Sequence, residues 1–254
     1  MARENALWQP LTEKDIDFLV GQAVPESGNK ERMKLCIKED PTFRERLIGD
    51  KKVLDSVRKK TSLSPNISPQ LYFEILLRGA IREMEEKTHT VERSATQRIP
   101  VFDLKETIEF MQEEYAVNYL AHLLSSFVAT GKETPKDIDI DFLLSLGKNA
   151  EDQTRYLIYK RIADICLFIL GIFPKHVMYD YYYLFFKKPL PIAVGPRRSL
   201  SEYEWLGREF YRLASKEKAA KAENLDELLQ TFSEKFNLAK KPLNFLSEHY
   251  LALV

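Results

Sequence analysis

Apolar residues recur three or four positions apart along most of this chain, and few segments alternate between apolar and polar residues as a half-buried strand would. In the stretch "PQLYFEILLRGAIREMEEK" (69–87), Leu71, Ile75, Ala80 and Met84 share one face of a helix. Only 9 of the 254 residues are glycine, and most of these lie at or near apparent helix ends. The pattern therefore predicts an all-α protein, a bundle of roughly eight to ten helices.

Start and stop signals give the expected helix boundaries. Ser68 and Pro69 supply an N-cap and a first-turn proline, and Ser199 is a second N-cap. The stretch "THTVERSATQRIPVF" (88–102) predicts an extended connection, and "KPLPIAVGPRRS" (188–199) predicts a loop. The expected helices span about 41–60, 68–87, 103–130, 151–170, 174–187 and 199–221, and two more follow before the C-terminus.

The length of 254 residues is at the upper end of what a single domain reaches. We expect one helical domain over 1–254, with a subdivision into N-terminal helices (1–100) and a main bundle (101–254) as the alternative. Acids dominate from Val101 to Gln153 and bases from Thr154 to Lys221, which is typical of neighbouring helical layers with complementary faces.

Composition argues against several classes of protein. The 38 acidic and 38 basic residues balance, which removes the excess positive charge that non-specific binding to nucleic acid depends on. The longest strongly apolar run, "ICLFILGIF" (165–173), has 9 residues, whereas a membrane-spanning helix takes about 20. The first residues lack the pattern of a signal peptide, and the 2 cysteines lie far apart. We therefore expect a cytoplasmic protein that binds neither membranes nor nucleic acid.

The common motifs for nucleotides, hydrolysis and metals are missing from the sequence. It contains no Walker loop, no Gly-x-Gly-x-x-Gly, no Gly-x-Ser-x-Gly and no His-Glu-x-x-His. Glu86 and His89 form its one Glu-x-x-His, at a helix end, whereas a di-iron bundle requires two such pairs and further glutamates. The sequence thus predicts no cofactor and no metal site.

Polar residues inside apolar helical stretches give the candidate catalytic cluster. Asn118 and His122 continue the apolar face of the helix expected over 103–130, so each must meet a polar group from another helix, a water or a ligand. Asp164 precedes the longest apolar run, and Arg161 is the cation that we expect to pair with it. His122, Asp164 and Arg161 form a site if their helices pack together; structural hydrogen bonding is the alternative.

Aromatic residues mark candidate interface or ligand-binding positions. The segment "YDYYYLFF" (179–186) holds six aromatic rings, too many for one face of a helix. Tyr179, Tyr182 and Tyr183 carry hydroxyls that favour an interface or a pocket wall over a dry core. Tyr203 and Tyr211 flank Gly207 at four-residue spacing, where either close helix packing or a ligand would explain the glycine.

Four blocks, "NISPQLYFEILLRGA", "RIPVFD", "RIADICLFILGIFP" and "SEYEWLGREFYRLAS", together resemble a family of uncharacterised bacterial helical proteins. Similar blocks occur in that family in the same order, over about 66–215 of this chain. Ala163 stands where the family pattern has glycine, whereas Asp164, Gly171 and Pro174 fit it. The resemblance implies an architecture with Asp164 as a shared polar position, and it implies no activity.

Two functional hypotheses follow from the sequence. The first is a non-catalytic helical protein that self-associates, or binds an apolar or aromatic small molecule, through the aromatic segment and the loop after it. The second is an enzyme with a buried site between helices, in which His122 acts as base or ligand, Asp164 orients it and Arg161 holds an anion.

Overall fold

The computed structural model of the chain describes residues 10–23, 29–58, 67–93, 98–113, 115–129, 139–174 and 198–251. Within these ranges it has 13 helices and one pair of short strands, which confirms the all-α prediction and exceeds the expected number of helices. The elements are α1 (Glu13–Ala23), α2 (Lys30–Glu39), α3 (Pro41–Ile48), α4 (Lys51–Arg58), α5 (Pro69–Glu85), β1 (Thr90–Arg93), β2 (Arg98–Val101), α6 (Leu104–Gln112), α7 (Ala116–Ala129), α8 (Ile140–Gly147), α9 (Asp152–Ile172), α11 (Leu200–Lys216), α12 (Lys218–Ala222), α13 (Asp226–Glu234) and α14 (Phe236–His249).

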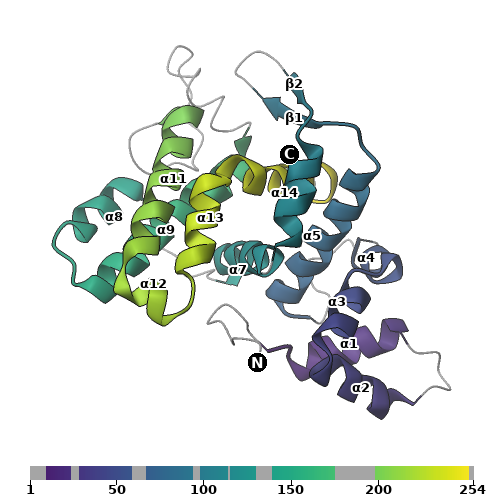
Figure 1. Cartoon of the computed structure of the whole chain (residues 1–254). Coiled ribbons are helices and arrows are strands. Elements are labelled where there is room, and N and C mark those ends of the chain that lie inside the picture. Colours follow the sequence, from purple (N-terminus) through teal and green to yellow (C-terminus); the bar gives the residue numbers. More distant parts are fainter. Residues whose placement is uncertain are drawn as a thin grey trace.

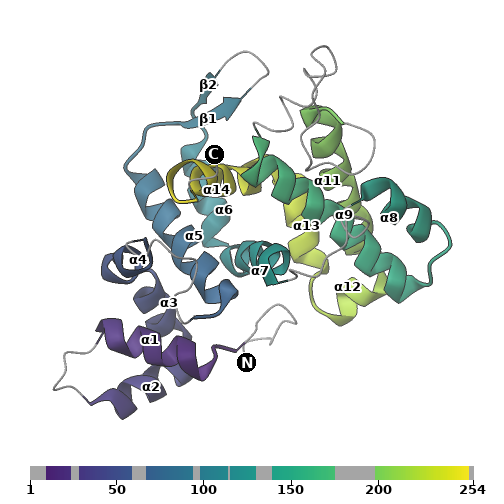
Figure 2. The ribbon, with the colours of Figure 1, turned by 180° about the vertical axis from the view of Figure 1, so that it is seen from behind.

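Helix α7 lies at the centre of the arrangement, between two groups of helices (Figures 1 and 2). On one side, α5, α6 and α14 pack together below the strand pair, and α1 to α4 gather at the far end of α5. On the other side, α9 packs against α8, α11 and α12, and α11 packs against α13. Because α14 contacts both α5 and α9, it links the two groups. Helix α7 contacts the same two helices and therefore also links them.

Local signals place several helix starts where the sequence predicts them. The Ser68 hydroxyl accepts a hydrogen bond from the Leu71 N–H, and Pro69 follows in the first turn of α5. Ser199 and Glu202 form a capping box at the start of α11. The predicted apolar stripe of α5 is buried along its whole length. Caps and stripes depend on near neighbours in the chain, so they can be recognised without the tertiary structure.

Three expected helices are broken, and the prediction was wrong at each. The helix expected over 199–221 divides at Glu217, which is extended, and the other two divide as follows. The helix expected over 41–60 ends at Gly49, and α4 restarts after Asp50, whose carboxylate accepts a hydrogen bond from the Lys52 N–H. The helix expected over 103–130 ends after α6, where Glu113 is extended and Tyr115 has a left-handed backbone (φ 72°). Neither glycine nor proline marks the break after α6, and a left-handed tyrosine is unfavourable by itself, so packing must hold it.

Residues 88–102, expected to form an extended connection, contain an antiparallel strand pair in which Thr90 lies opposite Val101. The Asp103 side chain makes no cap hydrogen bond at α6. It accepts a hydrogen bond from the Thr90 hydroxyl (2.6 Å) and forms an ion pair with Lys241 of α14. Asp103, the residue at the N-cap position of α6, thus joins the strand pair to α14.

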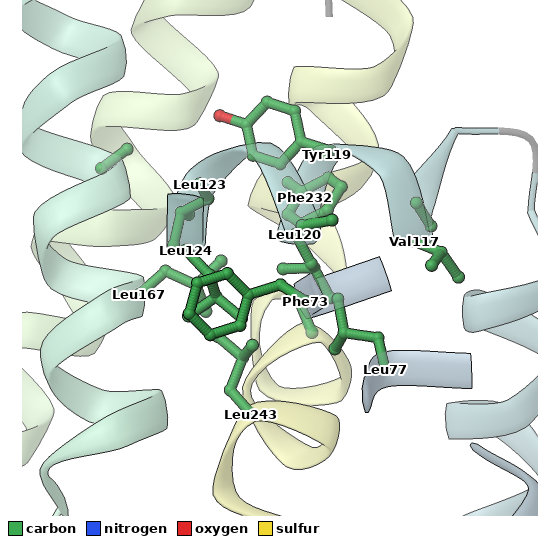
Figure 3. Packing of buried hydrophobic residues seen from close by; sticks show 14 of the residues in the cluster. Phe73, Leu77, Val117, Tyr119, Leu120, Leu123, Leu124, Leu167, Phe232 and Leu243 are labelled. Atoms are coloured by element: carbon green, nitrogen blue, oxygen red, sulfur yellow. The ribbon is translucent and has the colours of Figure 1, made fainter. Parts of the chain in front are cut away.

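Apart from Met84, the buried apolar side chains of the described residues form one cluster, which includes residues of every described helix from α1 to α14. Figure 3 shows Phe73 and Leu77 of α5, Leu120 of α7, Leu167 of α9 and Leu243 of α14 converging in it. No helix within the described ranges is long and apolar enough to cross a membrane.

Gly207 lies where α11 closely approaches α9 and α14. A Cβ atom at this position would lie 2.4 Å from the ring of Phe236 and 3.1 Å from the Cβ of Cys166. Close packing therefore accounts for this glycine, as the first of the two sequence alternatives proposed.

Candidate functional site

Asp164 lies in the middle of α9 with only 5% of its surface exposed. Its Oδ1 accepts hydrogen bonds from the hydroxyls of Tyr119 (2.5 Å) and Tyr211 (2.8 Å). Its Oδ2 pairs with the Nζ of Lys160, 2.7 Å away and one turn earlier in α9. These four residues, which we call the Asp164 network, connect α7, α9 and α11.

The physical reason for this network is the surroundings of Asp164. A carboxylate buried among apolar side chains is strongly unfavourable unless charge and hydrogen bonds compensate it. Lys160 lies four residues before it, on the same face of the helix, and supplies the charge. The Lys160 Nζ also lies 4.9 Å from the ring centroid of Tyr119, a cation–π contact. Both oxygens of Asp164 therefore have donors from the protein itself.

The two tyrosines in the network are fully buried, which fixes their protonation state. Burial raises the pKa of Tyr119 and of Tyr211 well above the ordinary value, and the negative charge of Asp164 raises both further. Both remain neutral hydrogen-bond donors. The ring centroid of Phe232 from α13 lies 4.5 Å from that of Tyr119 and 5.7 Å from that of Tyr211, so a third aromatic ring packs beside both tyrosines.

His122 lies on α7, one turn after Tyr119, and is half-buried. Its Nδ1 is buried and has no hydrogen-bond partner within the described ranges. Burial lowers the pKa of His122, the charge of Lys160 lowers it further, and Asp164 opposes both effects. The charge of Asp164 therefore acts on the His122 imidazole, as that of Lys160 does. The net effect favours the neutral form of the imidazole.

Arg161 does not take the place that the sequence predicted. Its guanidinium carbon lies 4.3 Å from the ring centroid of Phe127, and its Nη1 lies 3.4 Å from the Ser126 hydroxyl, both near the end of α7. The cation of Asp164 is Lys160 instead. Sequence spacing allowed either residue, and the aromatic ring on α7 provides Arg161 with a different partner.

The other predicted positions separate into different parts of the molecule. Tyr211 belongs to the Asp164 network, whereas Tyr203, on the same helix, is buried without contacting Asp164. Asn118 lines a small pocket of about 40 Å³ with Arg44 and Glu74, far below the size of an organic ligand site. Tyr179, Tyr182 and Tyr183 lie outside the described residues.

Tyr119 is a network member that the sequence reasoning missed, although a signal was present. It stands in the half of its helix that is apolar nearly all round, so its hydroxyl had to find a buried acceptor. Asp164 is the acidic residue that directly precedes the longest apolar run. The buried Tyr119 hydroxyl needs an acceptor and the buried Asp164 carboxylate needs a donor, so the sequence alone was enough to predict that the two residues pair.

A pocket of about 420 Å³ lies between the strand pair and α14, and we call it the hairpin pocket. Its floor includes buried Met84, Thr90 and Lys241. Its exposed rim includes Glu86, Lys87, Thr88, His89, Glu248 and His249, and the remaining lining residues are Val91, Leu104, Asn244 and Phe245. The Glu-x-x-His pair, which the sequence placed at a helix end, is thus part of the wall of a pocket.

Lys241 carries the charge at the floor of the hairpin pocket. Only 3% of its side chain is exposed, and it forms ion pairs with Asp103 and with Glu92 (3.6 Å). Burial lowers the pKa of Lys241, and the carboxylate of Glu92 opposes this effect. Two carboxylates therefore compensate one ammonium group at this position.

The hairpin pocket is lined by the rings of Phe245, His249 and His89, and Phe102 contacts His89 from outside the pocket lining. The rings of Phe245 and His249 stack in parallel with centroids 4.1 Å apart. The His89 ring lies 5.9 Å from that of Phe102, which is 79% exposed. The described residues contain no group of three or more His, Cys, Asp or Glu side chains arranged to hold a metal ion. The pocket offers rings and carboxylates to a ligand.

Comparison of the chain with protein-family models, with curated proteins and with solved structures gives no match.

Proposed function

We propose that this chain is a non-catalytic helical module that binds a small molecule with an apolar or aromatic portion, and that the hairpin pocket is its site. The observation that carries the proposal is the pocket itself. Its volume of about 420 Å³ falls within the range of organic ligand sites, roughly 300–1,000 Å³. Apolar side chains (Met84, Val91, Leu104) and polar groups converge on the same space.

The Asp164 network supports this choice by contrast. Its carboxylate is already compensated by Lys160, Tyr119 and Tyr211, so a ligand would have to displace a partner to reach it. Displacing one partner of a buried ion pair is costly, because the remaining charge is left uncompensated. The network accordingly fits a structural role, and the open pocket fits binding.

A ligand-observed NMR screen with small aromatic and aliphatic compounds tests the proposal. Thr88→Trp places a large side chain at the exposed rim of the pocket, and we expect it to weaken binding by about tenfold or more. Glu85→Trp is the matched control, because Glu85 is exposed and nearby but does not line the pocket. Compounds that bind equally well to the Thr88→Trp variant would show that the site lies elsewhere.

An enzyme remains the second candidate, and His122 favours it. Its Nδ1 has no partner within the described ranges, and its neutral form is favoured beside Lys160 and Asp164, so it can accept a proton. Turnover of a metabolite mixture, followed by mass spectrometry, tests this candidate. Turnover that His122→Gln abolishes would support it, and turnover unchanged in that variant would exclude His122 as the base.

Three further proposals concern context. We propose that residues 1–254 form a single domain, since one apolar cluster includes helices from both ends of the described chain. We propose membership of the bacterial helical family that the sequence resembles, and a cytoplasmic location.

Self-association is a separate proposal, supported by the 65% exposure of Trp205 on α11, and light scattering of the purified protein tests it. A monomer at all concentrations would contradict it.

A further inference from the structure

A second concave surface, of about 410 Å³, lies along α11 where this helix packs against α13 (Figure 1), and we call it the α11 groove. Its lining comes from α11, between Ser201 and Arg212, and from Ser233 of α13. At about 1.5 Å per helical residue, the α11 side is about 16 Å long. An extended segment of about five residues covers that length at about 3.3 Å per residue, so the groove has the dimensions of a short stretch of chain.

Trp205 gives the α11 groove its apolar surface. The residue is 65% exposed, and its indole lines the groove. Tryptophan and arginine are the residue types that most often dominate the binding energy of protein interfaces. Exposure by itself leaves the occupant open, so the charged groups beside Trp205 must decide which partner fits.

Arg208 lies one turn after Trp205, is exposed, and is joined to the buried Ser233 by two hydrogen bonds. Its Nε donates to the Ser233 carbonyl oxygen (3.2 Å), which orients the guanidinium. The Ser233 hydroxyl donates to the Arg208 carbonyl oxygen (2.8 Å), which fixes α11 against α13. Among the described residues, the two terminal nitrogens of this guanidinium have no partner. They form the planar fork that can bind both oxygens of a carboxylate.

The carboxylates that line the groove have other partners. Both oxygens of Glu209 accept hydrogen bonds from Arg212, one of them at 2.9 Å. Glu204 accepts a hydrogen bond from a side-chain amide of α14 (2.8 Å) and pairs with Lys240 (3.5 Å). Within the described ranges, Arg208 is therefore the cation of the groove lining that lacks a carboxylate. A partner complements it by supplying one.

We propose that the α11 groove docks a segment of a partner protein, about five residues long, that presents a carboxylate beside an aromatic or apolar side chain. The carboxylate binds the fork of Arg208, and the apolar side chain packs on the indole of Trp205. A nucleic-acid strand fits less well, because it carries a negative charge at every phosphate and would meet Glu204 and Glu209 in the same wall. This site is separate from the hairpin pocket and does not depend on it.

Three peptides that differ in one residue test the inference by NMR titration of the ¹⁵N-labelled protein. They are acetyl-Ser-Phe-Glu-Phe-Ser-amide and its counterparts with Gln or Lys at the centre. The indole N–H of Trp205 reports binding, and since the chain has 2 tryptophans, Trp205→Phe assigns its signal. We expect the Glu peptide to bind about two- to fivefold more tightly than the Gln peptide, the ratio that one exposed ion pair supplies, and the Lys peptide to bind most weakly.

Variants in the groove locate the effect. Arg208→Gln should make the affinities for the Glu and Gln peptides equal, and an unchanged affinity for the Gln peptide would show that the variant is folded. Trp205→Ala should weaken all three peptides by about fivefold or more, as followed by the backbone amides of the groove. Lys216→Gln is the matched control for Arg208→Gln. Lys216 is an exposed cation of α11 outside the groove, so its loss should leave the preference for the Glu peptide intact.

Four outcomes would overturn the inference. Equal binding of the Glu and Gln peptides to the wild type would show that the inferred charge is wrong. A preference lost as fully in Lys216→Gln as in Arg208→Gln would reduce it to general electrostatic attraction. Absence of any shift in the groove signals would mean that no such segment docks there. Self-association that Trp205→Ala abolishes in light scattering would assign the groove to a second copy of this chain.

Discussion

The Asp164 network and the hairpin pocket both contain an ion pair with a buried member, but they differ in what surrounds it. Asp164 is enclosed by fully buried tyrosines from two other helices, and its cation Lys160 keeps only 15% of its side chain exposed. Lys241 is as deeply buried, yet its partners Asp103 and Glu92 keep 23% and 41% of their side chains exposed. A buried charge whose partners come from several helices, such as Asp164, holds those helices together. A buried charge at the floor of an open pocket, such as Lys241, leaves room for a ligand beside it.

Loss of the Asp164 carboxylate should have the largest effect on stability. In Asp164→Ala, two buried hydroxyls lose their acceptor and Lys160 loses its counter-ion, so we expect the free energy of unfolding to fall by about 3–5 kcal/mol. Urea denaturation followed by circular dichroism measures it. Glu227→Ala, at an exposed position of α13, should stay within about 0.5 kcal/mol of the wild type. A loss in Asp164→Ala no larger than that control would contradict a structural role for the network.

Lys241→Met tests the other half of the comparison. Methionine keeps most of the apolar volume, and the two carboxylates left behind can turn to water, so we expect a smaller loss of about 1–3 kcal/mol. The same denaturation experiment applies. A loss equal to that of Asp164→Ala would mean that the two ion pairs are equally enclosed.

Removal of one hydroxyl from the network should cost less again. Tyr211→Phe leaves Asp164 with Tyr119 and Lys160, so we expect a loss of about 1–1.5 kcal/mol. In the Asp164→Ala background the same substitution removes a hydroxyl that has already lost its acceptor. There it should be neutral or stabilising, and a double-mutant cycle would show the coupling. Additive losses would mean that Tyr211 does not act through Asp164.

His122 should have the smallest effect, visible only as a dependence on pH. Because its pKa is lowered in the folded protein, the unfolded chain takes up a proton first as pH falls below the ordinary histidine value of 6.5. The contribution of neutral His122 is therefore complete above that value and is lost as pH falls through the folded pKa. Urea midpoints at about pH 7.5 and about pH 5 should differ less in His122→Gln than in the wild type. Equal differences would show that His122 titrates freely.

The helix starts at Ser68 and Ser199 and the buried stripe of α5 could be predicted because each depends on residues within one or two turns. The break at Tyr115 could not, because its left-handed backbone is held by packing that no local pattern records. The helical count was too low because the predicted 41–60, 103–130 and 199–221 helices each divide in two, and because α1, α2 and α8 were not predicted.

Of the candidate sites, Asp164 and Tyr211 were recognised as individual positions, but not as partners. Choosing Lys160 over Arg161 as the cation required the position of the Phe127 ring on another helix. The hairpin pocket could not be predicted from the sequence, because Glu86 and His89 form only one part of its rim. Another part, Glu248 and His249, comes from the end of the chain.

By itself, the sequence determined the all-α class, the starts of helices such as α5 and α11 and the buried face of α5, because helical periodicity and capping are local properties of the chain. It also determined that a charged group at Asp164 and a hydroxyl at Tyr119 would require compensation. Only the tertiary structure decided which groups supply it, since residues 45 and 47 positions from Asp164 meet there as α7, α9 and α11 pack. The hairpin pocket was decided in the same way, because a concave surface exists only where elements distant in sequence lie side by side.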